Sequence, residues 1–153
     1  MIIKRAGTED IELLIKLRLD FLAEEKGFVS SEEQDAIAKK FETYSYKHLA
    51  DGDFIAWIAF DDFGQVLSTA FLSIVERPPR AAFSSYLVGT VYNVFTYPAC
   101  RRKGIATKVM SALIEEAKAL HVASVDLLAA NDGKPLYENL GFNISSKYVY
   151  MKI

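Results

Sequence analysis

Residues suited to binding an anion lie in the turn Arg101-Arg102-Lys103-Gly104-Ile105-Ala106, between a β-rich run and an apolar helical pattern. The first turn of a helix presents backbone N–H groups without intrahelical partners and a partial positive charge, so it binds phosphate without a side-chain ligand. Gly104 lets an anion approach the backbone closely, Ala106 leaves the first helical turn open, and three basic side chains add positive charge. The turn is suited to a diphosphate.

A plainer interpretation of the same turn is also open. Gly104 can serve only as a tight turn, with Arg101, Arg102 and Lys103 as a solvated basic face. Other phosphate-binding motifs do not compete, since the sequence has no G-x-x-x-x-G-K-[ST] and no G-x-G-x-x-G through Gly104. A nucleoside triphosphatase or a dinucleotide dehydrogenase is therefore disfavoured.

Other reactive groups are few. Cys100 is the single cysteine, and His48 and His121 are the only histidines. The sequence therefore contains no CxxC or HExxH motif, and we expect no metal site. Cys100 is interpreted as incidental. Eighteen Lys and Arg against twenty Asp and Glu give a net charge of −2, which does not favour a nucleic-acid or membrane partner.

Length and hydropathy indicate one soluble domain over 1–153. The chain has 153 residues, of which 51% are hydrophobic and 25% charged. No apolar run approaches the ~20 residues that span a bilayer. The start Met1-Ile2-Ile3-Lys4-Arg5 becomes charged too soon for a secretory signal, so we predict a cytoplasmic protein.

The elements that must position the turn alternate between strand and helix patterns. The first half predicts a strand at Ile2 to Arg5, a helix from Gly7-Thr8 to about Glu25, a more polar helix from Ser30 toward Tyr46, and a hairpin of Phe54 to Phe60 and Val66 to Val75. The second half predicts a strand at Val88 to Thr96, a long helix, a strand at Val122 to Ala129, a short helix and a last strand. Because Val122 to Ala129 is apolar on both faces, we expect it to be central in the sheet. Together these patterns predict an α/β (α+β) fold with a mixed, mostly antiparallel sheet of about six to seven strands and about four helices.

Two motifs together resemble the GNAT superfamily of acyl-CoA-dependent N-acetyltransferases. The family signature [RQ]-x-x-G-x-[GA] is met by Arg101 to Ala106, and the element L-Y-x-x-x-G-F is met by Leu136 to Phe142. The resemblance covers about Val88 to Phe142, whereas the N-terminal half agrees in element order only.

The resemblance implies acetyl-CoA as co-substrate and two strands splayed apart at its site. The backbone from Arg102 to Thr107 would hold the pyrophosphate, and the pantetheine arm would pair like an extra strand with Val94 to Thr96. An ordinary buried strand at Val94 to Thr96 would have the same sequence pattern. Asn131, which would contact the coenzyme arm, lies six residues before Tyr137, whereas in many family members this spacing is seven. A loop or capping role for Asn131 explains the sequence equally well. The implied coenzyme contacts are Val94, Phe95, Thr96, Arg101, Arg102, Lys103, Gly104, Ile105, Ala106, Thr107 and Asn131.

Acetyl transfer to an amine requires a neutral amine, a polarised thioester carbonyl and a proton for the departing thiolate. The resemblance places Tyr137 as the general acid, and a phenol pKa near ~10 suits protonation of a thiolate. A tyrosine on the apolar face of a short helix would give the same pattern. Backbone N–H groups of Val94 to Thr96 are the expected groups that polarise the carbonyl.

The general base is left open by the sequence. Asp126 is a candidate, because a carboxylate between apolar neighbours on a central strand is costly unless it has a role. A partner arginine would explain it equally well. Glu24, Glu25, Glu42 or a chain of waters are the alternatives.

The expected activity is transfer of an acetyl group from acetyl-CoA to a primary amine, by direct attack in a ternary complex. The alternative is a non-catalytic acyl-CoA-binding sensor or subunit with the same fold. In the family the acceptor site is shaped by segments that match Phe21 to Asp51 and Glu76 to Tyr86, whose aromatic and acidic residues suit a small amine or a peptide N-terminus. Exposed edge strands and the run Tyr148-Val149-Tyr150-Met151 favour a homodimer.

Overall fold

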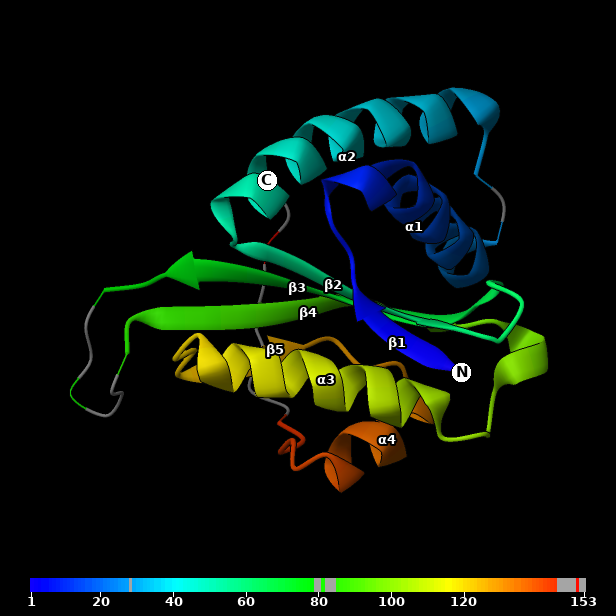
Figure 1. Ribbon diagram of the computed structural model, residues 1–153. Helices are drawn as coiled ribbons and strands as arrows, with labels where there is room; N and C mark the ends of the chain where they lie inside the picture. Colours follow the sequence, from blue (N-terminus) through cyan, green and yellow to red (C-terminus); the bar gives the residue numbers. More distant parts are fainter. Residues whose placement is uncertain (28, 79–80, 82–84, 146–150, 152–153) are drawn as a thin grey trace.

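The computed structural model describes residues 1–27, 29–78, 81, 85–145 and 151. Five strands form one sheet, in the order of the sequence (Figure 1). The first four pair antiparallel, and the fifth pairs parallel with the fourth. The strands are β1 (Ile2–Arg5), β2 (Phe54–Phe60), β3 (Val66–Glu76), β4 (Leu87–Thr96) and β5 (Ser124–Leu127).

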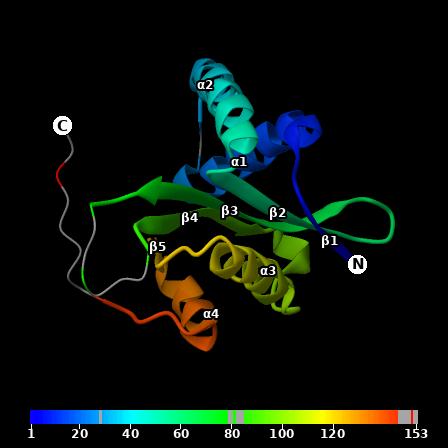
Figure 2. The ribbon, with the colours of Figure 1, turned by 60° about the vertical axis from the view of Figure 1, so that its left-hand side comes forward.

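Helices cover both faces of this sheet (Figures 1 and 2). One face carries α1 (Ile11–Lys26) and α2 (Ser31–Asp51), and the other carries α3 (Ile105–Ala119) and α4 (Lys134–Asn139). The predicted start of α2 is confirmed, because the Ser30 hydroxyl accepts a hydrogen bond from the Glu33 N–H in a capping box. No helix in the described ranges is both long and apolar enough to cross a membrane.

Each face of the sheet has its own apolar core, which fixes the helices against it. On the α1 and α2 face, Leu14 and Leu17 pack with Phe54 and Phe71. On the other face, buried α3 residues pack with alternate residues of β2, β3 and β4, and Tyr137 of α4 joins them. Because successive side chains of a strand point to opposite faces, the central strands contribute to both cores.

Two expectations about the sheet are wrong for the described residues. They form five strands where six to seven were expected, and β5 is the last strand of the sheet rather than a central one. β5 is also shorter than the predicted run Val122 to Ala129, and its Ser124 and Asp126 are exposed. The apolar composition of that run reflects packing of Val125 and Leu127 on one face only. The predicted last strand follows Phe142, and its residues 148–150 lie outside the described residues.

Candidate active site

The edge of β4 that faces β5 is open over its second half. The parallel ladder joins Val88 to Ser124 and ends where Val91 meets Leu127. β4 continues for five residues to Thr96, and there it pairs only with β3 within the described part of the chain. Because β5 ends at Leu127, the edge N–H and C=O groups of β4 beside Val94, Phe95 and Thr96 have no strand partner on that side within the described residues, and the expected splay of two strands stays a prediction.

A β-bulge lies at the same place in β4. Tyr92 pairs with Phe71 and Phe95 pairs with Thr69, so Ala70 faces both Asn93 and Val94. Asn93 has a φ of 53°, in the left-handed region that asparagine tolerates better than most residues. A bulge bends the strand and redirects its backbone N–H and C=O groups, so this edge is suited to a partner other than a regular neighbouring strand.

The Asn93 side chain fixes the bulge against α1. It is 2% exposed, its Nδ2 donates to the Leu17 carbonyl at 3.1 Å, and its Oδ1 accepts from Arg18 Nη1 at 3.2 Å. Sequence reasoning did not single out Asn93. The available signal was an asparagine inside the apolar run Val91 to Phe95, where an unpaired amide would be costly.

The turn after β4 presents unpaired backbone donors, as predicted. Arg102 has a φ of 62° and Gly104, the N-cap of α3, a φ of 71°. Gly104 offers no side-chain cap, and the first N–H of this helix with an acceptor in the described residues is that of Lys108, which bonds the Gly104 carbonyl at 3.3 Å. The N–H groups of Ile105, Ala106 and Thr107 are therefore available to an anion.

The basic side chains of the turn mostly brace the loop. Arg101 Nε donates to the Thr96 carbonyl at 2.9 Å, and its guanidinium pairs with Glu24 at 2.6 Å. Lys103 Nζ donates to the Ala99 carbonyl at 3.0 Å. Because these groups are exposed, their ion pairs contribute little stability. The solvated-face interpretation thus fits the side chains, and the anion-site interpretation fits the backbone.

Tyr137 is buried in α4 with its ring held on two sides. A Cβ added at Gly133 would lie 3.1 Å from Tyr137 Cε2, and the Phe142 ring meets Tyr137 edge-on with centroids 5.9 Å apart. Burial, with a smaller effect of Asp132, raises the pKa of Tyr137 above its ordinary value. Tyr137, Ile105 at the start of α3 and Val94 of β4 all pack in the core on the α3 face.

Asp126 is not the buried carboxylate that the sequence suggested. It is exposed, and it accepts a hydrogen bond at 2.7 Å from Thr90, its ladder partner on β4. The physical reason is that Val125 and Leu127 pack in the core on the α3 face, so Asp126 between them lies on the opposite face of the strand. Asn131 is also exposed, in a short 3₁₀ turn (Asn131–Gly133). The roles of both residues stay predictions.

A cavity of about 320 Å³ lies on the α1 and α2 face of the sheet. Of the acidic residues in the expected acceptor segments, Glu24 pairs with Arg101, Glu25 and Glu42 are exposed, and none of the three is among the described residues that line this cavity. Phe28 and Phe83 lie outside the described residues. Among the described residues the lining is aromatic with one cation and one hydroxyl side chain, namely Arg18, Phe41, Tyr44, Phe54, Phe71, Ser73 and Tyr92.

Arg18 is the charged group of this cavity. Burial lowers the pKa of Arg18, against a smaller opposing effect of Glu25 and Tyr92, yet a guanidinium remains charged at any physiological pH. Its Cζ lies 5.7 Å from the centroid of the Phe21 ring. The sequence held a signal for it, because Arg18 stands four residues after Leu14 and four before Leu22, both buried on α1.

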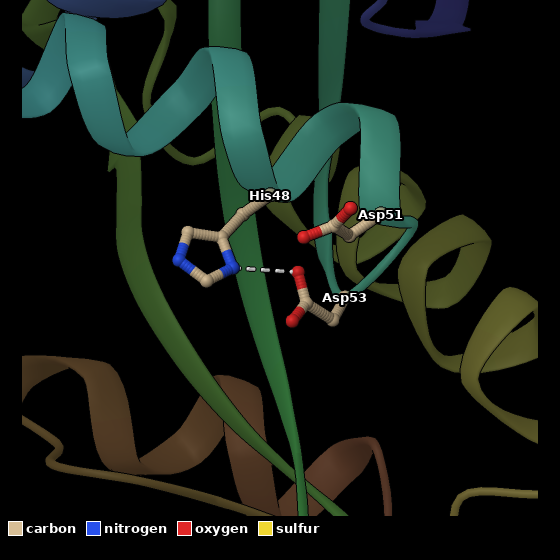
Figure 3. Close-up of side chains that lie close together, drawn as sticks. All are labelled: His48, Asp51 and Asp53. Atoms are coloured by element: carbon tan, nitrogen blue, oxygen red, sulfur yellow. Dashed lines mark hydrogen bonds and ion pairs between the residues drawn. The ribbon is translucent and has the colours of Figure 1, made fainter.

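One group of three potential metal ligands occurs among the described residues, at the C-terminal end of α2. His48, Asp51 and Asp53 place one ligand atom each within 4.8 Å of one another, and Figure 3 shows the His48 ring turned toward Asp53. His48 Nδ1 lies 2.8 Å from Asp53 Oδ1. An ordinary histidine–carboxylate hydrogen bond accounts for this pair, and the expectation of no metal site stays a prediction.

Comparison with known proteins agrees with this geometry. Residues 52–144 match the family model described as "Acetyltransferase (GNAT) domain". A predicted acetyltransferase from Clostridium acetobutylicum, solved with acetyl-CoA, superposes with a TM-score of 0.87 and 28% identity over 99% of this chain and 95% of that chain. The comparison with curated proteins gave no match.

Two further solved structures share the fold at lower identity. A GCN5-related N-acetyltransferase from Ralstonia eutropha has a TM-score of 0.80 and 22% identity over 99% of this chain and 97% of that chain. Glucosamine-6-phosphate N-acetyltransferase from Arabidopsis thaliana has a TM-score of 0.68 and 20% identity over 99% and 96%. The family model covers more than half of the chain, and on that ground the protein belongs to the GNAT acetyltransferase family.

Proposed function

We propose that this protein transfers the acetyl group of acetyl-CoA to a primary amine by direct attack in a ternary complex. The observation that carries the proposal is the continuity of two features along the chain. The open edge of β4 from Tyr92 to Thr96 leads within eight residues to the uncapped start of α3 after Gly104. The edge of β4 provides hydrogen-bonding groups for an amide-bearing arm, and the start of α3 provides N–H donors for a diphosphate.

The free backbone donors at the start of α3 and the open edge of β4 support acetyl-CoA as the ligand of this site. The N–H groups of Ile105, Ala106 and Thr107 would bind the pyrophosphate, and the edge of Val94 to Thr96 would pair with the pantetheine amides. Acetyl-CoA in the Clostridium acetobutylicum relative supports this assignment. Asn131 would contact the arm from the loop before α4.

The reaction needs one bond formed and one bond broken. The amine nitrogen attacks the carbonyl carbon of the thioester, the C–N bond forms, and the C–S bond breaks. Tyr137, kept protonated by its raised pKa, would donate its proton to the thiolate. The amine loses a proton to Asp126 or to water. Backbone N–H groups at the bulge would stabilise the charge on the carbonyl oxygen.

Asp126 is favoured as the base by its place in the sheet. Ser73, Thr90 and Asp126 are ladder partners across β3, β4 and β5, so their side chains point to the same face. Ser73 lines the cavity on that face. A row of polar groups therefore leads from the cavity to Asp126.

The test combines coenzyme binding with turnover. Calorimetry with coenzyme A should detect binding, and thiol release from acetyl-CoA should appear with an amine panel. Tyr137→Phe should lose turnover while keeping coenzyme affinity, whereas Tyr46→Phe, at an exposed position of α2, should change neither. Binding without transfer to any amine would favour the sensor alternative, and absence of binding would overturn the proposal. A cytoplasmic location, a homodimer and the lack of a nucleic-acid or membrane partner stay predictions from the sequence.

A further inference from the structure

We propose that the acceptor is a free α-amino acid with a large apolar side chain, whose carboxylate pairs with Arg18. This inference rests on the proposed function for the acetyl-transfer step. Its basis is the aromatic cavity between α1, α2 and the sheet, in which Arg18 is the one cation among the described lining residues and is hydrogen-bonded to Asn93 of the β4 bulge.

Arg18 has no carboxylate partner within 4.0 Å among the described residues, although other cations nearby have one. On the same helix Lys16 pairs with Asp20 at 2.5 Å, and in the turn after β4 Arg101 pairs with Glu24 at 2.6 Å. Arg18 uses one donor, toward Asn93 Oδ1. A guanidinium has five N–H donors, so four remain for a ligand.

The environment of Arg18 makes an anionic ligand favourable. Its guanidinium borders a cavity lined by five aromatic rings, and desolvation is the main influence on its pKa. A partly desolvated cation interacts more strongly with an incoming anion than an exposed one does. A planar guanidinium also matches the two oxygens of a carboxylate.

The charge balance favours a carboxylate over a phosphate. A single guanidinium neutralises one negative charge, whereas a phosphate monoester carries nearly two at neutral pH. The other lining groups are aromatic rings and the Ser73 hydroxyl, which suit an apolar side chain better than a hydroxyl-rich sugar. The Ser73 hydroxyl is already an acceptor for the Tyr44 hydroxyl at 3.3 Å.

The position of Arg18 sets the distance between the carboxylate and the reacting amine. Through Asn93, Arg18 is tied to the bulge, where the open edge of β4 begins and where the thioester is proposed to lie. A carboxylate on Arg18 therefore lies close to the transferring acetyl group. An amine and a carboxylate on the same carbon satisfy both requirements together.

The rest of the cavity extends away from the bulge. Phe71 pairs with Tyr92 next to the bulge, and Ser73, with its partner Phe54 on β2, lies two residues farther along β3. Same-face neighbours two residues apart on a strand are separated by about 6–7 Å. Phe41 and Tyr44 of α2 cover this part. An apolar side chain of the size of leucine or phenylalanine would occupy it.

The reaction with this acceptor is balanced without further reactants. The α-amine nitrogen forms the C–N bond with the acetyl carbonyl carbon, and the C–S bond to coenzyme A breaks. The thiolate takes the Tyr137 proton, and one amine proton leaves through Asp126 or water. The products are an N-acetyl amino acid and free coenzyme A.

The test compares acceptors that differ in one group. Phenylalanine, phenylalaninamide and phenethylamine share the ring and the amine, but only the first has a carboxylate. In the wild-type protein we expect kcat/KM for phenylalanine to exceed that of the other two by about tenfold or more, as for a partly desolvated charge-assisted pair. Equal values, or a preference for glucosamine 6-phosphate, would overturn the inference.

A variant locates the effect at Arg18. Arg18→Met keeps length and apolar contact, so we expect it to raise KM for phenylalanine at least tenfold while phenethylamine changes little. Arg18→Lys should restore part of the preference. Lys26→Met, an exposed cation at the end of the same helix, serves as the matched control. Unchanged coenzyme affinity and melting temperature in Arg18→Met would show that the site is intact.

Direct binding separates this inference from the proposed function. Calorimetry with phenylalanine and phenylalaninamide, in the presence of coenzyme A, needs no turnover. Arg18-dependent binding of phenylalanine without any acetyl transfer would leave the ligand class standing and overturn the transferase proposal. Acetyl transfer to amines with no preference for a carboxylate would support the transferase proposal and overturn the inference about the ligand class. No binding of phenylalanine would overturn the inference whatever the turnover shows.

Discussion

Arg18 donates a hydrogen bond of 3.2 Å to Asn93, and this contact joins the lining of the cavity to the bulge in β4. Asn93 in turn donates to the Leu17 carbonyl, so α1 holds the bulge through two successive residues. The cavity and the open strand edge are thereby joined through the same pair of side chains.

Asn93→Ala should lower both stability and coenzyme affinity. It removes two hydrogen bonds of a buried amide and places alanine at a φ of 53°, for a combined loss of about 2–4 kcal/mol in the free energy of unfolding. Urea denaturation and calorimetry with coenzyme A measure the two effects. Asn93→Gly keeps the backbone conformation, so it should retain more coenzyme affinity than Asn93→Ala. Equal affinities for the two variants would contradict a role for the bulge geometry.

Gly104→Ala should weaken coenzyme binding through backbone strain alone. A Cβ at Gly104 meets nothing within 4 Å, but its φ of 71° costs alanine about 1–2 kcal/mol. Gly64, in the β2–β3 turn, has a φ of 81° and equally open space, so Gly64→Ala is a matched control. Both variants should lose similar stability, and only Gly104→Ala should lose affinity for coenzyme A. A similar affinity loss in both would argue against the α3 start as the pyrophosphate site.

Deprotonation of Tyr137 should not lower kcat at any pH below about 10. The acid must be protonated to act, so activity is lost as pH rises through its pKa, and burial moves that pKa above the ordinary phenol value near ~10. The measurement is kcat against pH up to the limit of protein stability. A decline near pH 8 that disappears in Tyr137→Phe would contradict this assignment.

Asp126→Asn tests the general base. If Asp126 takes the amine proton, kcat at neutral pH should fall by about 10²-fold and recover in part at alkaline pH, where more amine is already neutral. Asp35→Asn, at an exposed position of α2, is the control and should leave kcat unchanged. An unchanged kcat in Asp126→Asn would leave proton removal to water.

The features that depend on nearby residues in the sequence were the most predictable. The turn from Arg101 to Ala106 and the element from Leu136 to Phe142 are local, because a positive φ at Gly104 and an open helix start depend on neighbouring residues. The capping box of Ser30 and Glu33 was predictable for the same reason. Each of these features is encoded within a few positions.

Features that depend on tertiary neighbours were not predictable. Asp126 was expected to be buried, but burial at β5 depends on what packs against each face, and Asp126 is exposed while its neighbours Val125 and Leu127 pack in the core on the α3 face. Arg18 and Asn93 lie 75 positions apart, so their contact and the cavity beside it arise only when α1 packs on β4. Of the residues that line the cavity, Phe41 and Tyr44 belong to the expected acceptor segment Phe21 to Asp51, whereas Arg18 lies outside both expected segments.

Amide hydrogen exchange with and without coenzyme A tests the central claim most directly, because it reports on the backbone groups proposed to bind. The account predicts protection on coenzyme binding at the N–H groups of residues 94–96 and 102–107, with little change in β1 and β2. Coenzyme binding that protects another surface while leaving both of these segments unchanged would contradict it.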